Sequence, residues 1–219
     1  MKKLVSGHRS LVLLGALVAG IISTAFSEQG GGGWLILVIG YVLLGIGGAY
    51  LLGASRRWCI AVSALAIPLI IFEFLLLGGS QDALTLKIAA RLCVMGLLGL
   101  LFFVVIDYSV LAEGARKTDR ILSGICGYLL IAYFWSNLYF LIEILAAGSF
   151  DDLSGGDMTR VDFLYFSLSS LTTLGYGDIV PLSGPARIFS ALESVFGVLY
   201  LAIFISALVA SPQKRESPT

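Results

Sequence analysis

The stretch Leu171-Thr-Thr-Leu-Gly-Tyr-Gly-Asp178 decides how the rest of this 219-residue chain is interpreted. In an ordinary strand, successive backbone groups point to opposite sides. Gly175 and Gly177 lack a Cβ atom, so they can adopt positive φ angles that turn successive carbonyls to the same side. A row of neutral, closely spaced oxygens can replace the water around a dehydrated cation and still release it. The two glycines therefore allow this stretch to present a row of backbone carbonyls on one side.

The composition is that of a membrane protein. Hydrophobic residues make up 58% of the chain and charged residues 13%, with a mean hydropathy of +0.97, whereas soluble domains are about 45–50% apolar and about 25% charged. This apolar content is sufficient for about six helices that each need about 20 residues to cross a bilayer. It excludes a cytosolic, secreted or disordered protein. The 14 Lys and Arg balance the 14 Asp and Glu without a long basic run, which excludes a free-standing nucleic-acid binder.

Six apolar runs are candidates for membrane-spanning helices. A further run, 161–171, has about 11 residues and is too short to cross about 30 Å of hydrocarbon as a helix. It predicts a re-entrant helix whose ends are covered by protein or water. The expected fold class is an all-α membrane protein with six transmembrane helices and one re-entrant helix. The spanning runs are 11–26, 34–54, 58–77, 84–106, 121–145 and 186–210.

Charges in the connecting segments indicate the orientation. Cytoplasmic loops carry an excess of Lys and Arg, so the basic side is predicted to be the cytoplasm, with both termini inside and the re-entrant helix entering from outside. The first run also has an alternative interpretation as a signal peptide, because it has a basic start and small residues near its end. Its cleavage would leave the remaining topology unchanged. Ten of the 14 basic residues lie on the predicted inner side: Lys2, Lys3, Arg9, Arg56, Arg57, Arg116, Lys117, Arg120, Lys214 and Arg215.

The quoted stretch resembles the selectivity filter of potassium channels, whose usual form is Thr-Val-Gly-Tyr-Gly-Asp. The resemblance extends over residues 121–210, with Leu174 in place of the usual valine. It implies that K+ is the permeant ion, that no cofactor or other metal is needed, and that the Thr173 hydroxyl forms the innermost ring of oxygens. The ion-coordinating residues it assigns are Thr173, Leu174, Gly175, Tyr176 and Gly177.

One chain supplies only one wall of such a cage. Closing the cage requires rotational symmetry, and four copies around one axis are implied. We therefore expect a four-fold symmetric homotetramer in the plasma membrane. Its surroundings are the lipid bilayer, and neither a nucleic acid nor a soluble protein is expected as a partner.

The short re-entrant helix has predicted supports at both ends. Thr159 and Asp162 fit a capping box at its start. Its C-terminus, near Thr172, would direct partial negative charge towards the pore. In the family, an aromatic donor of this helix often bonds the filter aspartate. The resemblance therefore predicts a hydrogen bond from Tyr165 to Asp178.

Two residues of the last apolar run are unusual for a membrane helix. Glu193 is a carboxylate about two turns into the run, and we expect it to pair with hydroxyls of the re-entrant helix rather than to contact the ion. Gly197 lies mid-helix, where glycine costs about 1 kcal/mol relative to alanine. The resemblance places Gly197 at the gating hinge of the inner helix, and close helix packing is the alternative.

The first four spans resemble a voltage sensor with most of its charges missing. The fourth span of voltage-gated relatives carries Arg or Lys at every third position, whereas only Lys87 and Arg91 occur here. Glu73 could pair with either of them in a static ion pair. We therefore expect weak or no voltage dependence. The expected units are a voltage-sensor-like four-helix bundle (1–106), a cytoplasmic linker (107–120), a pore domain (121–210) and a short cytoplasmic tail (211–219).

Three other functions compete with a potassium channel. A weakly selective cation channel would share the architecture, but related non-selective filters commonly lose the tyrosine found here at Tyr176. Potassium uptake transporters usually repeat the pore loop four times in one chain, whereas this chain has one copy and no internal repeat. An enzyme on the first four spans would lack an acid–base or metal cluster, and nothing near the single histidine, His8, could orient it. We therefore expect a channel and not an enzyme.

Overall fold

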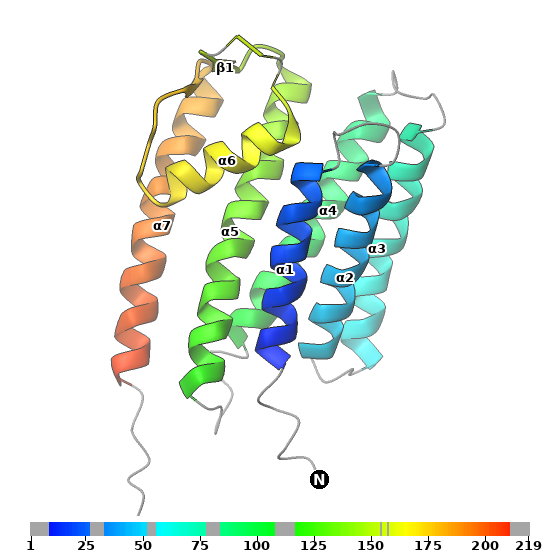
Figure 1. Cartoon of the computed structure of the whole chain (residues 1–219), viewed down its shortest axis with the longest axis vertical. Helices are drawn as coiled ribbons and strands as arrows, with labels where there is room; N and C mark the ends of the chain where they lie inside the picture. The colour runs from blue at the N-terminus through cyan, green and yellow to red at the C-terminus, as the bar shows by residue number, and fades with distance from the viewer. Residues whose placement is uncertain are drawn as a thin grey trace, which may run out of the picture.

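The computed structural model describes residues 9–26, 33–51, 56–77, 84–107, 117–153, 155–156 and 158–210. In this part of the chain, seven helices run mostly side by side and two short strands pair at one end (Figure 1). The helices are α1 (Arg9–Phe26), α2 (Gly33–Leu51), α3 (Arg56–Leu77), α4 (Leu84–Ile106), α5 (Lys117–Leu145), α6 (Arg160–Leu171) and α7 (Gly184–Ala210), and the strands are β1 (Phe150–Asp152) and β2 (Ile179–Pro181).

The seven helices lie where the apolar runs predict them, with ends shifted by a few residues. Two details differ from the prediction. The fold is not entirely α-helical, because β1 and β2 pair in an antiparallel ladder between segments far apart in sequence. The linker was expected to extend to residue 120, but α5 already begins at Lys117. The helix therefore includes polar residues that precede the apolar run, because its backbone hydrogen bonds do not depend on apolar side chains. Residues 108–116, the tail 211–219 and the loop at 27–32 lie outside the described residues.

Three helices of the described part are long and apolar enough to cross a membrane, judged by length and composition. They are Leu84–Ile106, Thr118–Leu145 and Gly184–Ala207, and the shorter apolar helices Ser10–Phe26, Val38–Gly48 and Ile60–Leu75 accompany them. These helices support the prediction that the chain is a membrane protein, whereas the number of six crossings stays a prediction.

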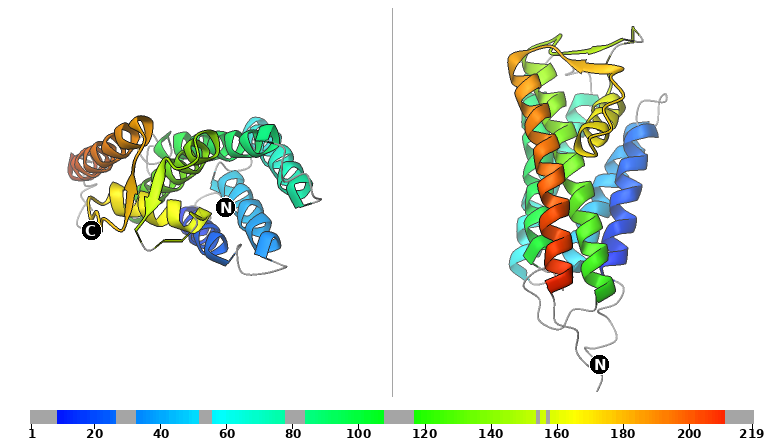
Figure 2. Two further views of the ribbon diagram at one scale, coloured as in Figure 1. Left: turned by 90° about the horizontal axis from the view of Figure 1, so that it is seen from above. Right: turned by 90° about the vertical axis from the view of Figure 1, so that its left-hand side faces the viewer.

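Helix α5 occupies the centre of the molecule. Helices α1, α4, α6 and α7 all pack against it (Figures 1 and 2). A large apolar core joins α5 to the four N-terminal helices, and it includes the fully buried side chains Leu13, Leu17, Leu44, Leu97 and Leu130. Burial of such side chains is the main favourable contribution to this packing against other helices.

A second core, built from aromatic rings, holds the short helix α6 in place. Phe163 and Phe166 of α6 pack against Tyr139 of α5 and Phe150 of β1, with ring centroids between 5.2 and 5.4 Å apart. Edge-to-face pairs of this kind add to the free energy of burial. They fix α6 at the oblique angle visible in Figure 1, where it crosses α5 between α7 and α1.

The strands tie the segment after α5 to the segment after α6, and one carboxylate holds the segment after α5 on that helix. Phe150 of β1 lies opposite Pro181 of β2, and the N–H of Leu153 donates to the carbonyl of Asp178 at 2.9 Å. Glu143, in the last turn of α5, accepts hydrogen bonds from three successive backbone N–H groups, those of residues 148–150, at 2.6, 3.0 and 3.2 Å. The C-terminal end of the quoted stretch is therefore anchored to the segment after α5.

Candidate functional site

The start of α6 is fixed by its own residues. The carboxylate of Asp162 accepts hydrogen bonds from the backbone N–H of Thr159 at 2.8 Å and from its hydroxyl at 2.6 Å. The side-chain bond to the N-cap backbone is the part of the capping box that was predicted from Asp162, and it is confirmed. This closes the first turn of a helix that has only 12 residues.

Three alternate residues after α6 adopt positive φ angles. They are Thr173 at 58°, Gly175 at 56° and Gly177 at 79°. The two glycines confirm the expected alternation, but Thr173 was not predicted, and within the described residues it is the one non-glycine residue with a positive φ. A β-branched residue in this conformation carries strain that the surrounding structure has to offset.

Four consecutive backbone N–H groups of this stretch bond back to the end of α6. The N–H groups of Leu174 and Gly175 donate to the carbonyl of Ser169 at 2.9 and 3.2 Å, and that of Thr173 donates to the carbonyl of Ser170 at 3.0 Å. The N–H of Tyr176 donates to the Ser169 hydroxyl at 3.3 Å. These four bonds explain how the strained backbone is held, and the importance of Ser169 was not predicted.

The carbonyl oxygens of residues 173–177 form the complementary face. No hydrogen bond from a residue in the described part of the chain reaches these five oxygens. Four consecutive N–H groups point towards α6, so the alternating φ angles turn the carbonyls the other way. An open row of backbone oxygens of this kind can coordinate a cation that has lost its water.

Two aromatic side chains and one carboxylate flank the C-terminal end of the row. The Tyr165 hydroxyl donates to the Asp178 carboxylate at 2.6 Å, which confirms the predicted bond. The rings of Tyr165 and Tyr176 are stacked, with centroids 5.8 Å apart. The hydrogen bond from Tyr165 lowers the pKa of Asp178 below its ordinary value, and the same bond raises the pKa of Tyr165 to about 12. Asp178 is therefore charged at neutral pH.

Glu193 lies behind this stretch and is fully buried. It accepts one hydrogen bond from the Ser167 hydroxyl at 2.5 Å and another from the Tyr139 hydroxyl at 2.6 Å. The predicted pairing with a hydroxyl of the short helix is confirmed at Ser167, whereas the Ser169 hydroxyl accepts the N–H of Tyr176. Tyr139 was missed because it lies 54 residues away in sequence. Glu193 thus connects α7, α6 and α5.

Gly197 allows α7 to touch the end of α6. A Cβ atom at this position would lie 2.2 Å from the carbonyl oxygen of Leu171, which is a backbone atom and cannot rotate away. The Tyr128 hydroxyl of α5 donates to the same carbonyl at 3.0 Å. The structure therefore gives Gly197 a packing role, which was the alternative interpretation, and the gating hinge stays a prediction.

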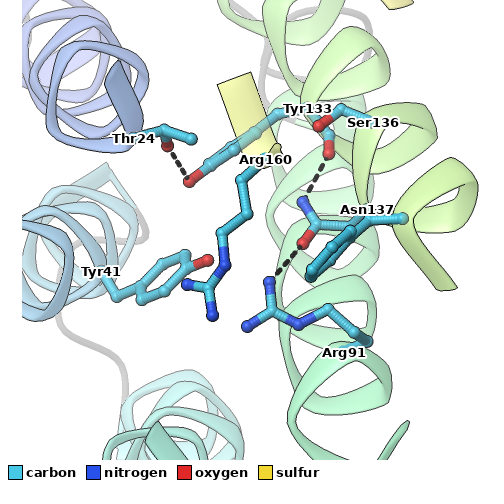
Figure 3. Close-up of a pocket in the computed structure, with 8 residues that line it drawn as sticks. Thr24, Tyr41, Arg91, Tyr133, Ser136, Asn137 and Arg160 are labelled. Carbon is cyan, nitrogen blue, oxygen red and sulfur yellow. Dashed lines mark hydrogen bonds between the residues drawn. The ribbon is translucent and has the colours of Figure 1, made fainter. Parts of the chain in front are cut away.

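The predicted ion pair between α3 and α4 is present and has an additional member. Glu73 pairs with Arg91 and also with Arg160, the first residue of α6, at 3.3 Å. In the described part of the chain Lys87 makes no ion pair with Glu73. Both arginines point into a small cavity beside Tyr41 and Asn137 (Figure 3), with room for about one water molecule. Arg160 was missed because its partner lies 87 residues earlier in the chain.

Comparison with known proteins gives matches in the C-terminal part of the chain. Residues 121–214 match a family model described as "Ion channel". The sequence is 35% identical over 71 residues to a two pore potassium channel of Oryza sativa subsp. japonica, covering 32% of this chain and 20% of that protein. It is 32% identical over 79 residues to the inward rectifier potassium channel Kirbac3.1 of Paramagnetospirillum magnetotacticum, covering 36% and 26%. It is 37% identical over 60 residues to the voltage-gated potassium channel Kch of Escherichia coli, covering 26% and 14%.

These matches have a limited extent. The chain spans less than a third of the length of the curated relatives it matches, from 12% to 30%. No solved structure shows a significant match. The matched family is an ion-channel family and not an enzyme family. The matched residues 121–214 of this chain include the whole carbonyl row.

Proposed function

We propose that this chain, whose residues 121–214 match the ion-channel family model and resemble potassium channels, belongs to the potassium channel superfamily and is a subunit of a potassium-selective channel. K+ passes without covalent chemistry along the carbonyl oxygens of Thr173, Leu174, Gly175, Tyr176 and Gly177. The observation that carries this proposal is the alternation of positive φ angles, combined with four N–H groups bonded to one side. It supports a row of oxygens suited to a dehydrated cation.

The channel is a homotetramer around this row. One chain forms one wall, and closure by rotation requires further copies. Exposed apolar surface supports this assembly: 11% of the apolar stretch of α7 is buried, against 44% in α4 and 50% in α5. The side chains of Leu174 and Tyr176 are 58% and 65% exposed in the single chain. Neighbouring copies would cover these surfaces.

The chain crosses the plasma membrane six times with both termini in the cytoplasm. Helices α1–α5 and α7 are the crossings, and α6 is a re-entrant helix that enters from outside. Its 12 residues span about 18 Å, less than the hydrocarbon thickness. Residues 1–106 form the sensor-like bundle, 107–116 the linker, 117–210 the pore domain and 211–219 the tail.

Residues around the row hold it rather than bind the ion. Thr172 caps α6 through its hydroxyl, which donates to the carbonyl of Leu168 at 2.7 Å. Asp178 and Tyr165 brace the outer end, and Glu193 braces the helix from behind. The Thr173 hydroxyl forms the innermost oxygen ring.

The reversal potential tests this function directly. Purified protein in planar bilayers, with K+ on one side and Na+ on the other, should reverse near the potassium equilibrium potential. Gly177→Ala should abolish this selective current, because alanine is strained at a φ of 79°. Gly155→Ala is the matched control, since Gly155 has a φ of 85° outside the row. Selective current in Gly177→Ala would contradict the proposed filter.

A reversal potential near zero, with current present, would indicate a weakly selective cation channel. This outcome would point to Leu174, the residue that replaces the usual valine. A current that needs a second solute on the same side would indicate an uptake transporter instead.

A further inference from the structure

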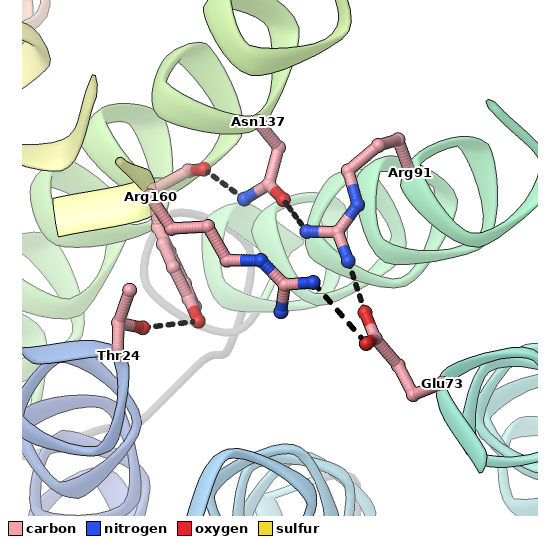
Figure 4. Close-up of polar contacts among 6 residues, drawn as sticks. Thr24, Glu73, Arg91, Asn137 and Arg160 are labelled. Atoms are coloured by element: carbon pink, nitrogen blue, oxygen red, sulfur yellow. Dashed lines mark hydrogen bonds and ion pairs between the residues drawn. The ribbon is translucent and has the colours of Figure 1, made fainter. Parts of the chain in front are cut away.

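A buried carboxylate joins the N-terminal bundle to the helix that holds the filter. Glu73 of α3 contacts Arg91 of α4 through one oxygen and Arg160 of α6 through the other (Figure 4). The side chains of Glu73 and Arg91 are 9% and 3% exposed, and that of Arg160 is 26% exposed. Glu73 is therefore shared between the bundle and the first residue of α6.

Helix α5 fixes the position of the two arginines. The guanidinium carbons of Arg91 and Arg160 lie 5.4 and 5.7 Å from the ring centroid of Phe140, within the range of a cation–π interaction. The Arg91 side chain also donates to the side-chain oxygen of Asn137 at 3.2 Å. The amide nitrogen of Asn137 in turn donates to the carbonyl of Tyr133 at 2.8 Å. The charged groups thus have a rigid support on a third helix.

The charge balance makes Glu73 the critical member. Among the described residues, two guanidinium groups contact the one carboxylate of Glu73, and all three side chains are largely removed from solvent. Removing the carboxylate would leave two positive charges side by side, and breaking a buried pair by removing one partner is strongly unfavourable. Arg160, the more exposed of the two arginines, would have to move away.

Movement of Arg160 is transmitted to the filter because α6 is short and rigid. Arg160 begins the helix, and Ser169 and Ser170 near its other end accept the N–H groups of the filter backbone. A tilt of α6 about its aromatic core would therefore pull on these hydrogen bonds. We propose that Glu73 is a positioning residue for the ion filter, and that it acts by fixing Arg160 at the start of α6.

This inference rests on the proposed channel function, so the wild-type protein is measured first. Potassium current and its decay during sustained opening are recorded in planar bilayers for wild type, Glu73→Gln, Arg160→Gln and the double variant. Each single variant should lose current about tenfold faster, which is within the range of coupling through packed networks. The double variant should be no worse than Glu73→Gln alone, because one interaction is lost in both cases. Arg160→Lys, which keeps the charge, should restore part of the stability of the current.

Arg187→Gln is the matched control. It removes one positive charge from an exposed position near the start of α7. The ion pairs of Glu73 are with Arg91 and Arg160 instead. Its current should decay as in wild type, which would separate the effect of Arg160 from a general change of surface charge at the pore mouth.

A second measurement covers variants that assemble poorly. K+ bound in the filter should raise the thermal stability of the detergent-solubilised protein above its value in Na+, and Arg160→Gln should reduce this K+-specific increment. The role of Glu73 would be overturned if the current of Arg160→Gln decayed as slowly as that of wild type and its K+-specific gain in thermal stability were unchanged. Additive effects on decay in the double variant would overturn it as well. Absence of both current and increment in wild type would instead overturn the proposed channel function, and this inference with it.

Discussion

At the scale of single residues, the proposed filter should depend on a few side chains to which we assign no ion contact. Tyr165 is the simplest case, because its hydroxyl makes one bond to Asp178. Tyr165→Phe removes that bond and keeps the ring stacked on Tyr176. We expect current to decay about fivefold faster during sustained opening, since a charge-assisted hydrogen bond is lost. Decay as slow as in wild type would show that the bond does not stabilise the conducting filter.

The same bond predicts how external acid acts. The pKa of Asp178 is lowered by the Tyr165 hydroxyl, so the charged, bonded form is fully present above the ordinary carboxyl pKa and is lost as pH falls through the lowered value. Wild-type current should therefore withstand external acid down to about pH 4. In Tyr165→Phe the pKa of Asp178 returns towards its ordinary value, and acid inhibition should begin at a higher pH. A titration of current against external pH measures both curves.

Gly197 distinguishes packing from hinge motion. Gly197→Ala would place a methyl group against the Leu171 carbonyl, and overpacking of this kind typically costs about 1–3 kcal/mol. We expect a lower thermal stability of the assembled protein. Gly99→Ala is the control, because Gly99 is also mid-helix and has nothing within 4 Å of the added atom. Unchanged stability combined with a lower open probability would favour the hinge.

At the scale of elements, the segment after α5 is held by one carboxylate. Glu143→Gln keeps the size of the side chain but replaces one acceptor oxygen by a donor, so at least one of three N–H bonds is lost. These bonds are partly exposed to solvent, and a hydrogen bond to a charged group contributes at most about 1.5–3 kcal/mol. Hydrogen exchange at residues 148–150 should become faster. Asp151→Asn, an exposed change in the neighbouring strand β1, should leave it unaltered.

The elements differ in how far the sequence predicts them. Each helix follows from a local apolar run, and Gly175 and Gly177 mark the turn of the filter backbone by their own chemistry. The β1–β2 pair and the cap at Glu143 depend on segments that meet only in three dimensions, and a three-residue strand has no periodicity to detect. The positive φ of Thr173 likewise follows from the bonds to Ser169 and Ser170, not from its residue type.

At the scale of the whole molecule, the N-terminal helices and the pore half share one framework. Arg91 is the only basic residue in the middle part of α4, and it is bound by Glu73, Asn137 and Phe140 from two other helices. A sensor charge has to slide past its partners when the voltage changes. Arg91 would have to leave all three contacts together, so the network favours an immobile bundle.

The energies support the same conclusion and give a prediction for voltage dependence. Moving one charge through the full field gains about 2.3 kcal/mol per 100 mV, whereas breaking a buried ion pair costs about 3–5 kcal/mol. We therefore expect open probability to change little between about −100 and +100 mV, with less than about one elementary charge moved per subunit, against the three to four of strong sensors. Single-channel recording across this range measures it, with Lys87→Gln as a control for the second basic residue of α4. A steep conductance–voltage curve that Arg91→Gln flattens would contradict the immobile bundle and would assign the voltage sensor to Arg91.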